Sequence, residues 1–322
     1  MMALSFFCAW ILLSFGQSTL PHQGSEIQVG DRLVRIHCEQ NYEAFVYAKN
    51  LSAPDGLCFD GEGQLVVVEE TAGRITRIDQ GGKSHILAQN LHSPEGICRA
   101  PDGTLYVTED LADGRLLAIS PKGEVLALAS GLDAPEGVVQ MGDSIYITES
   151  TAQLSENFFA AHSRVSVLRR TEEGWSRPQL CLQVESPISF SEVVSDGAGG
   201  LIFANEVADG MFVRKALWHF DLSSKKLSLF ASGLKSPEGL ATTPGECGPF
   251  PLYVAEENAD GKGHGRISQV DEKGKCSIFA TGFFTLEDAV VAADGSIYVS
   301  EDATGLIIVL RPLLKQKRPR SQ

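Results

Sequence analysis

The sequence lacks the short motifs that mark several large enzyme classes. Its 322 residues contain no GxSxG nucleophile motif, no P-loop, no dinucleotide-binding glycine fingerprint, and no CxxC or Cys/His spacing typical of zinc sites. Basic residues are also scarce, with 27 Lys and Arg against 41 Asp and Glu. The net charge of −14 argues against nucleic acid or an anionic membrane surface as a partner.

Long apolar runs are missing too, and the run at the N-terminus is short. It extends from Ala3 to Phe15, is broken only by serine, and cannot span a bilayer. With the small residues near Gly16 it predicts a signal peptide over residues 1–16, although its start lacks Lys and Arg. A buried or membrane-tethering segment is the alternative. The expected localisation is secreted or the lumen of the secretory pathway, and the basic residues 313–322 are expected to form a solvated tail.

The chain does contain a recurring phrase: an apolar residue, two spacers, and then Pro–acid–Gly. Clear copies begin at Leu51, Leu91, Leu132 and Leu234, and weaker copies lie at 191–193 and 286–288. The copies are 40 to 56 residues apart, counted for example from Gly56 to Gly96 and from Gly137 to Val193. Repeats of this length are typical of propellers and solenoids.

Each repeat contains four short apolar runs separated by turns. The run from Leu105 to Thr108, for example, follows the turn at 101–103, where Gly103 supplies a positive φ. Alternating polarity with a turn about every ten residues indicates strands rather than helices. We therefore predict an all-β fold, a six-bladed β-propeller with four antiparallel strands per blade.

The two ends of the repeat region predict how the ring closes. The last repeat, Leu286 to Pro312, has only three strands, and the N-terminal run from Phe45 to Leu51 resembles the fourth strands of other repeats. Pairing of this run with the last blade would remove exposed strand edges. We expect a single propeller domain over residues 43–312, preceded by an N-terminal extension over residues 17–42.

Cysteine usage gives a weaker indication. Outside the predicted signal peptide there are six cysteines, an even number that is compatible with an oxidising compartment. Cys247 and Cys276 fall in turns at the same end of the fifth blade and are the best candidates for a disulfide. Cys58 and Cys98, on neighbouring inner strands, are expected to be small buried residues.

The acids of the repeated phrase begin the innermost strands, which line the channel of a propeller. The set is Asp55, Glu95, Glu136, Glu192, Glu238 and Glu287. Six crowded carboxylates stay ionised only beside a cation, or else have strongly raised pKa values. Oxygen ligands favour Ca²⁺ over Mg²⁺, so the predicted cofactor is a divalent cation, with Ca²⁺ as the first choice. The alternative is that each acid caps backbone N–H groups of the next blade.

A second set of acids ends the second strands: Glu69, Glu109, Glu149, Glu206, Glu256 and Glu301. In four blades the third strand begins with arginine, namely Arg74, Arg115, Arg164 and Arg266, and blade four offers Arg214 or Lys215. Hairpin pairing predicts cross-strand ion pairs for these blades. Blade six has Leu306 instead, so Glu301 and the adjacent Asp302 become candidate catalytic residues.

Loops between the second and third strands lie on the same face as the motif acids, and two are enlarged. The insertion at 151–162 supplies Asn157, Phe158 and Phe159, which with Met211 are candidate substrate-binding residues. Packing of the insertion onto the blades is the alternative for these aromatic side chains. Three histidines are placed on this face as candidate proton carriers, and each is otherwise an ordinary surface residue: His92, His162 and His264.

The repeated motif resembles that of the SMP-30/gluconolactonase-like propellers, which are related to paraoxonases. Its sequence pattern is also similar to that of NHL repeats. The resemblance covers about residues 43 to 312. It implies a central divalent ion held by Glu, Asn and Asp at the starts of the inner strands, matching the six motif acids, none of which is asparagine here. The segment from Pro101 to Glu109 also resembles virginiamycin B lyase, which implies metal-assisted elimination of an ester.

Three functions follow as hypotheses. The first is a secreted, metal-dependent enzyme acting on a small ester, lactone or related natural product, in which the ion polarises a carbonyl. The second is a non-catalytic propeller of the NHL type that binds a small ligand or a protein on the same face. The third is a metal-dependent lyase. All three predict a small-molecule or protein partner at the channel mouth, without nucleic acid and without a stable membrane span.

Overall fold

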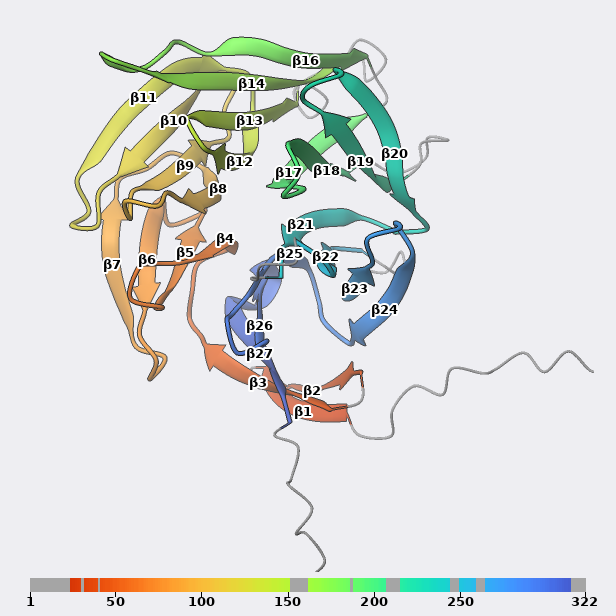
Figure 1. Ribbon diagram of the computed structural model, residues 1–322. Helices are drawn as coiled ribbons and strands as arrows, with labels where there is room; N and C mark the ends of the chain where they lie inside the picture. Colours follow the sequence, from red (N-terminus) through yellow and green to blue (C-terminus); the bar gives the residue numbers. More distant parts are fainter. Residues whose placement is uncertain are drawn as a thin grey trace, which may run out of the picture.

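In the computed structural model, six antiparallel sheets are arranged around one central axis (Figure 1). The structure describes residues 24–29, 32–39, 41–150, 162–185, 188–206, 215–243, 249–258 and 264–313. Within these ranges the helical content is one 3₁₀ turn, Asp302–Thr304, and no helix is long and apolar enough to cross a membrane. The predicted all-β propeller is confirmed.

The first three blades follow the chain from the inner strand outward. Blade one consists of β4 (Pro54–Phe59), β5 (Leu65–Glu69), β6 (Arg74–Ile78) and β7 (Ser84–Gln89). Blade two consists of β8 (Pro94–Arg99), β9 (Leu105–Glu109), β10 (Gly114–Ile119) and β11 (Val125–Leu132). Blade three consists of β12 (Pro135–Met141), β13 (Ser144–Ser150), β14 (His162–Thr171) and β16 (Gln179–Glu185), with a short additional strand, β15 (Gly174–Trp175), paired to β14.

The other three blades complete the ring. Blade four consists of β17 (Ser189–Ser195), β18 (Gly200–Glu206), β19 (Ala216–Asp221) and β20 (Lys226–Ser232). Blade five contains β21 (Pro237–Ala241), β22 (Leu252–Glu256), β23 (Arg266–Val270) and β24 (Cys276–Thr281). Blade six consists of β25 (Leu286–Val291), β26 (Ile297–Glu301), β27 (Leu306–Pro312) and β3 (Tyr42–Ala48).

Ring closure by the N-terminal strand is also confirmed. β3 pairs antiparallel with β27, and Ile307 lies opposite Ala48. The residues before β3 hold a feature that the sequence did not reveal: β1 (Gly24–Val29) and β2 (Arg32–Cys38) form a hairpin. Because β2 pairs with β24, this hairpin extends blade five to six strands, and Ser25 Oγ accepts a hydrogen bond from Ala44 N at 2.8 Å. The segment from 24 to 48 therefore joins blades five and six.

The apolar core lies between neighbouring blade faces, where the branched residues of the strands pack. Leu65 and Val67 of blade one, for example, pack in one cluster with Ile307 of blade six, and all three are fully buried. All five cysteines in the described part of the chain are free thiols, and Cys58 is buried as expected. Cys276 Sγ lies 3.4 Å from the Ser232 carbonyl, whereas Cys247 lies outside the described residues, so the structure gives their predicted disulfide no support.

The glutamates at the ends of the second strands link the strands of each blade to the loop that precedes its inner strand. Glu69 accepts two hydrogen bonds from Arg74, at 2.8 and 2.7 Å, another from Thr76, and a fourth from the Ser52 amide of the loop before β4. Burial by itself raises the pKa of Glu69, but these hydrogen bonds outweigh it and lower the pKa. The same pattern of arginine and loop amide recurs in three blades, at Glu109, Glu149 and Glu256. The predicted cross-strand ion pairs are thus confirmed in four blades, as structural links.

We expect truncation to separate the two roles of the N-terminal segment. A chain that begins at residue 42 keeps β3 and should fold with a lower melting temperature, because blade five loses only its outer hairpin. A chain that begins at residue 50 exposes the edge of β27 and should aggregate. Thermal unfolding monitored by circular dichroism, together with size-exclusion chromatography, measures both outcomes. A soluble, fully stable chain from residue 50 would contradict the observed closure.

A second expectation concerns the buried glutamates. Glu256→Ala removes the partner of Arg266 inside blade five and should destabilise the fold by about 3 kcal/mol. Glu26→Ala is the matched control, because its ion pair with Arg35 is exposed on both sides and is worth less than about 1 kcal/mol. Urea unfolding of the two variants measures the difference. Equal losses of stability would show that the buried pair is not a structural link.

Candidate functional site

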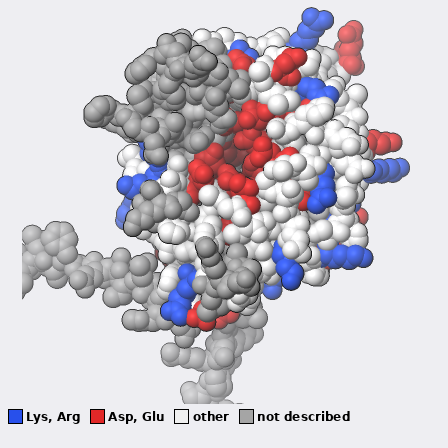
Figure 2. Space-filling view, turned by 180° about the vertical axis from the view of Figure 1, so that it is seen from behind, with Lys and Arg blue, Asp and Glu red and all other residues white. Residues whose placement is uncertain are grey.

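Acidic side chains gather in a hollow at the centre of one face of the propeller (Figure 2). The hollow narrows from a wide outer chamber of about 230 Å³ to a small inner chamber of about 20 Å³. The inner chamber can hold a single water-sized atom or ion, whereas the outer chamber has room for a small molecule. Four carboxylates form part of the wall of both chambers: Asp55, Glu95, Glu238 and Glu287.

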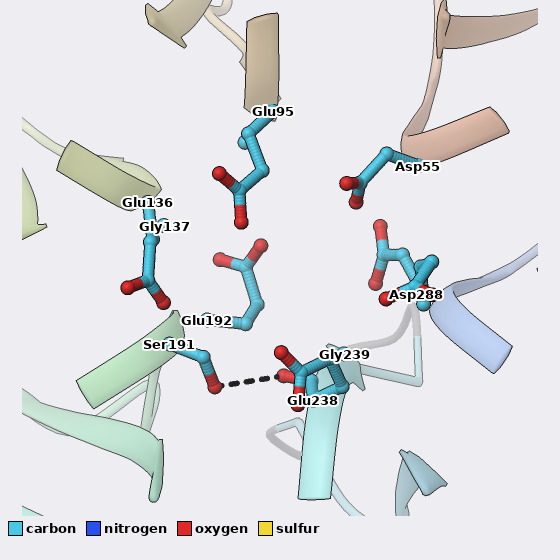
Figure 3. A pocket seen from close by; sticks show the side chains of 11 residues that line it. Asp55, Glu95, Glu136, Gly137, Ser191, Glu192, Glu238, Gly239 and Asp288 are labelled. Atoms are coloured by element: carbon cyan, nitrogen blue, oxygen red, sulfur yellow. Dashed lines mark hydrogen bonds between the residues drawn. The ribbon is translucent and has the colours of Figure 1, made fainter. Parts of the chain in front are cut away.

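A β-bulge in each inner strand presents these side chains to the channel. In blade one, Pro54 lies opposite Glu69 and Leu57 lies opposite Val67, so Asp55 and Gly56 are the bulged residues. The same shift occurs in all six inner strands. Bulges redirect side chains locally and are common next to functional sites. Here they turn the motif acids toward the axis (Figure 3).

Glycine at the second bulge position lets neighbouring blades approach. A Cβ on Gly56 would lie 2.4 Å from the carbonyl oxygen of Glu95, and one on Gly96 would lie 2.2 Å from that of Glu136. A side chain at these positions would therefore collide with the backbone of the next blade. This explains why the repeated motif pairs an acid with glycine. The acid lines the channel, and the glycine allows neighbouring inner strands to lie close together around the axis.

The register corrects the sequence alignment of blade four. Phe190 lies opposite Asn205, and Val193 lies opposite Phe203, so the bulged residues are Ser191 and Glu192. Serine therefore occupies the acid position of this blade, and Glu192 occupies the glycine position. Blade six, in contrast, has an acid in both positions, Glu287 and then Asp288. The inner chamber is lined by seven carboxylates, one more than predicted: Asp55, Glu95, Glu136, Glu192, Glu238, Glu287 and Asp288.

Besides the four shared motif acids, the outer chamber has four further acids, most of which were not predicted from the sequence. Each directly follows the glutamate that ends a second strand: Glu70, Asp110, Glu257 and Asp302. Only Asp302 was a predicted site residue. The signal was present in the sequence as the acidic pairs at 69–70, 109–110, 256–257 and 301–302. One acid of each pair faces the blade, and the next faces the chamber, because successive residues of a strand point to opposite sides.

Burial and mutual repulsion make these carboxylates hard to ionise. Burial raises the pKa values of Asp55, Glu95 and Glu192 well above the usual range, and the charges of neighbouring acids raise them further. Burial raises the pKa of Asp288 to about 7, although backbone N–H groups of Leu57 and Ala289 oppose the shift. The chamber is therefore electrostatically unfavourable unless protons or a cation neutralise part of its charge.

The donor set fits a hard divalent cation, and one oxygen is poised for it. Asp288 is 7% exposed, its Oδ2 accepts a hydrogen bond from Leu57 N at 2.8 Å, and its Oδ1 is buried without a hydrogen-bond partner. All the ionisable groups around the inner chamber are carboxylates, the ligands that Ca²⁺ prefers. In the described part of the chain, however, no three acid, His or Cys side chains converge closely enough to hold an ion as they stand. Binding therefore needs side-chain rotation toward a common centre.

The predicted catalytic histidines do not line either chamber where the structure describes their side chains. His92 is an exposed side chain near the Glu109–Arg115 pair, with its Nδ1 3.3 Å from an Arg115 nitrogen, and His264 lies near Phe284. Neither histidine lines a chamber, and the side chain of His162 lies outside the described residues.

Of the acidic candidates, Asp302 lines the outer chamber and Glu301 does not. Glu301 accepts hydrogen bonds from Phe284 N and Thr304 Oγ1, so it is a structural link like its counterparts, with Thr304 in place of arginine. Burial raises its pKa, although these two hydrogen bonds oppose the shift. In blade four, buried Asn205 takes the position of these glutamates and accepts from Ser189 N, while the side chain of Glu206 lies outside the described residues.

The predicted substrate-binding residues cannot be placed. Asn157, Phe158, Phe159 and Met211 lie outside the described residues. Their role as a rim of the acidic hollow stays a prediction. The described ends of the same insertion, Ser150 and Ser163, are buried in blade three.

No protein family and no curated protein sequence matches this chain. Solved structures do match in fold. A gluconolactonase from Xanthomonas campestris aligns with a TM-score of 0.68 over 85% of this chain and 90% of its own, at 14% identity. An aldose sugar dehydrogenase from Streptomyces coelicolor, in its PQQ-bound form, aligns with a TM-score of 0.60 over 85% and 99%, at 16% identity. A streptogramin B lyase aligns with a TM-score of 0.56 over 84% and 98%, at 14% identity. At these identities the likeness establishes a shared propeller architecture, as the repeated phrase indicated, and the chemistry has to be argued from the site itself.

Proposed function

We propose that the protein is a divalent-cation-dependent enzyme that hydrolyses a small ester or lactone at the acidic hollow. The observation that carries the proposal is the pair of connected chambers, one of ionic size and one of molecular size, with four carboxylates in the wall of both. A small molecule in the outer chamber would lie directly above an ion in the inner one. The architectural likeness to a gluconolactonase is consistent with this reaction class.

A subset of the seven carboxylates of the inner chamber would hold the ion, with Ca²⁺ as the first choice. When bound, it would polarise a carbonyl and lower the pKa of a water molecule. The chain's own contribution is to position acids around the reacting groups. Asp110 and Asp302 line the outer chamber and would accept and return a proton. Burial raises the pKa of Asp110, which brings it closer to neutral pH.

The charge of the outer chamber restricts its substrates. Eight of the ten described residues that line it are acids, and the other two are Ala53 and Pro54. Anionic substrates are therefore disfavoured, and we propose a neutral or cationic one. Hydrolysis of an ester or lactone creates a carboxylate, which the remaining negative charge would repel. The same charge would thus favour uptake of a neutral substrate and release of an anionic product.

Secretion belongs to this proposal. The apolar run at 3–15 would direct export, and extracellular proteins commonly bind Ca²⁺ with dissociation constants of roughly 0.1 to 1 mM. A site of that affinity would be filled outside the cell.

One observation favours an alternative. Neither described histidine side chain near this face, His92 or His264, lines a chamber, so among the described residues proton transfer would depend on carboxylates. A ligand-binding propeller without catalysis would need no such group. A lyase would use the same acids and would release an unsaturated product instead of an alcohol and an acid.

Removal of divalent ions should lower both stability and activity. Chelator-treated protein should melt at a lower temperature than protein in millimolar CaCl₂, by an amount that grows with the Ca²⁺ concentration; a hundredfold excess over Kd stabilises by about 2.7 kcal/mol. Differential scanning fluorimetry measures the shift, and a panel of neutral lactones and esters, analysed by mass spectrometry, tests for turnover. MgCl₂ at the same ionic strength is the control. Binding of Ca²⁺ without turnover of any panel member would favour the ligand-binding alternative, and absence of binding would refute the proposal.

The ion should also reverse the pH dependence of stability. A carboxyl group with a raised pKa binds its proton more tightly in the folded chain than in the unfolded chain, where the pKa is about 4. The stability of the ion-free protein should therefore be greater at about pH 5.5 than at about pH 8, and the part contributed by Asp288 should be lost as the pH rises through its pKa of about 7. In Ca²⁺ the order should invert, because protons then compete with the ion. Melting curves in matched buffers measure this, and curves with the same slope in both conditions would contradict it.

A further inference from the structure

The inner chamber contains two acids where the repeat specifies glycine. Gly56, Gly96, Gly137 and Gly239 fill the second bulge position in four blades. Glu192 and Asp288 fill it in blades four and six. In those four blades the close approach of the next blade favours glycine, so an acid at this position in two blades is a departure that ring closure itself does not require.

These two acids lie deeper than most of the others. Both line the inner chamber, and neither lines the outer one. The only other acid confined to the inner chamber in the described residues is Glu136, which is 2% exposed. In Figure 3 the side chain of Glu192 reaches toward the middle of the ring, and Asp288 lies at its edge beside Asp55. The other four acids of the inner chamber also line the outer chamber.

Asp288 is held in place with one oxygen left over. Leu57 N, across the joint between blades six and one, donates to Oδ2 at 2.8 Å and fixes the carboxylate. Oδ1 is buried and has no hydrogen-bond partner. A buried, unpartnered charged oxygen is costly unless a cation or a proton compensates it. Gly239 makes room for this oxygen, because a Cβ there would lie 2.5 Å from Oδ1.

We propose that Asp288 and Glu192 anchor the divalent cation in the inner chamber, with Glu136 completing the set confined to that chamber. The four shared carboxylates then face the outer chamber and the substrate. This inference rests on the proposed function. It assigns different roles to the two sets of acids. The acids at the glycine position hold the ion, and the acids at the repeat position set the electrostatic potential where the substrate binds in the outer chamber.

Calorimetric titration of CaCl₂ into chelator-treated protein tests this division. Asp288→Asn keeps an oxygen for the Leu57 amide and removes the charge, and it should weaken Ca²⁺ binding at least about 30-fold. Glu192→Gln should weaken it at least about 10-fold. Glu257→Gln is the matched control: it removes one charge from the blade between them at a position that lines the outer chamber alone, and Kd should change less than about 5-fold.

The outcomes distinguish this inference from the proposed function. Wild-type protein that binds no divalent ion overturns both. Wild-type protein that binds Ca²⁺ while Asp288→Asn binds equally well overturns only the anchor role. A purely structural role of Asp288 would lower the melting temperature of the ion-free variant and leave Kd unchanged, which also overturns it. If Asp288→Asn fails to fold, Asp288→Gly, which restores the residue found in four other blades, and Glu192→Gln carry the same comparison.

Discussion

The close approach of six inner strands at one axis is the constraint on which the rest of the structure depends. Four bulges contain a glycine that touches the backbone of the next blade, and this contact sets the diameter of the channel. The residue before each of these glycines is an acid directed into the channel. The same geometry that closes the ring therefore forces carboxylates together, and their repulsion opposes ring closure until protons or a cation reduce it.

The acids at the ends of the second strands and the acids that line the two chambers have opposite environments. At the ends of the second strands, the glutamates of four blades each have an arginine and a loop amide as partners, so the charge is compensated within the blade: Glu69, Glu109, Glu149 and Glu256. Around the two chambers, the described residues include no arginine or lysine, and the charges of the acids remain concentrated at the axis. Compensated acids stabilise a fold, whereas concentrated acids create a binding potential for a cation. This contrast separates structure from function in a protein whose repeats look alike.

Much of this could be predicted from the sequence, and the failures have physical causes. The repeat, the strand pattern and the fourth-strand likeness of Phe45 to Leu51 were sufficient for the propeller and its closure, because local periodicity encodes them. The β1–β2 hairpin was missed because it pairs with β24, more than 200 residues away in sequence. Glu192 was misaligned because a bulge shifts the register by one residue, and one residue decides which position an acid occupies. Glu70, Asp110 and Glu257 were not predicted because the arginine pattern of each hairpin marks the preceding glutamate, whose side chain faces the other way.

Symmetry alone would give six equivalent acids and no preferred place for an ion or a substrate. The departures from symmetry are therefore the informative residues, and they cluster. Blade four replaces the motif acid by Ser191 and places Glu192 one residue later, while blade six adds Asp288 at the joint where the ring closes. At that joint the Leu57 amide meets the Asp288 carboxylate instead of a glycine, so closure of the ring and orientation of an unpartnered oxygen depend on the same contact. An ion bound there would neutralise the repulsion at the axis and reinforce the last joint formed by the chain, which links occupancy of the site to the integrity of the propeller.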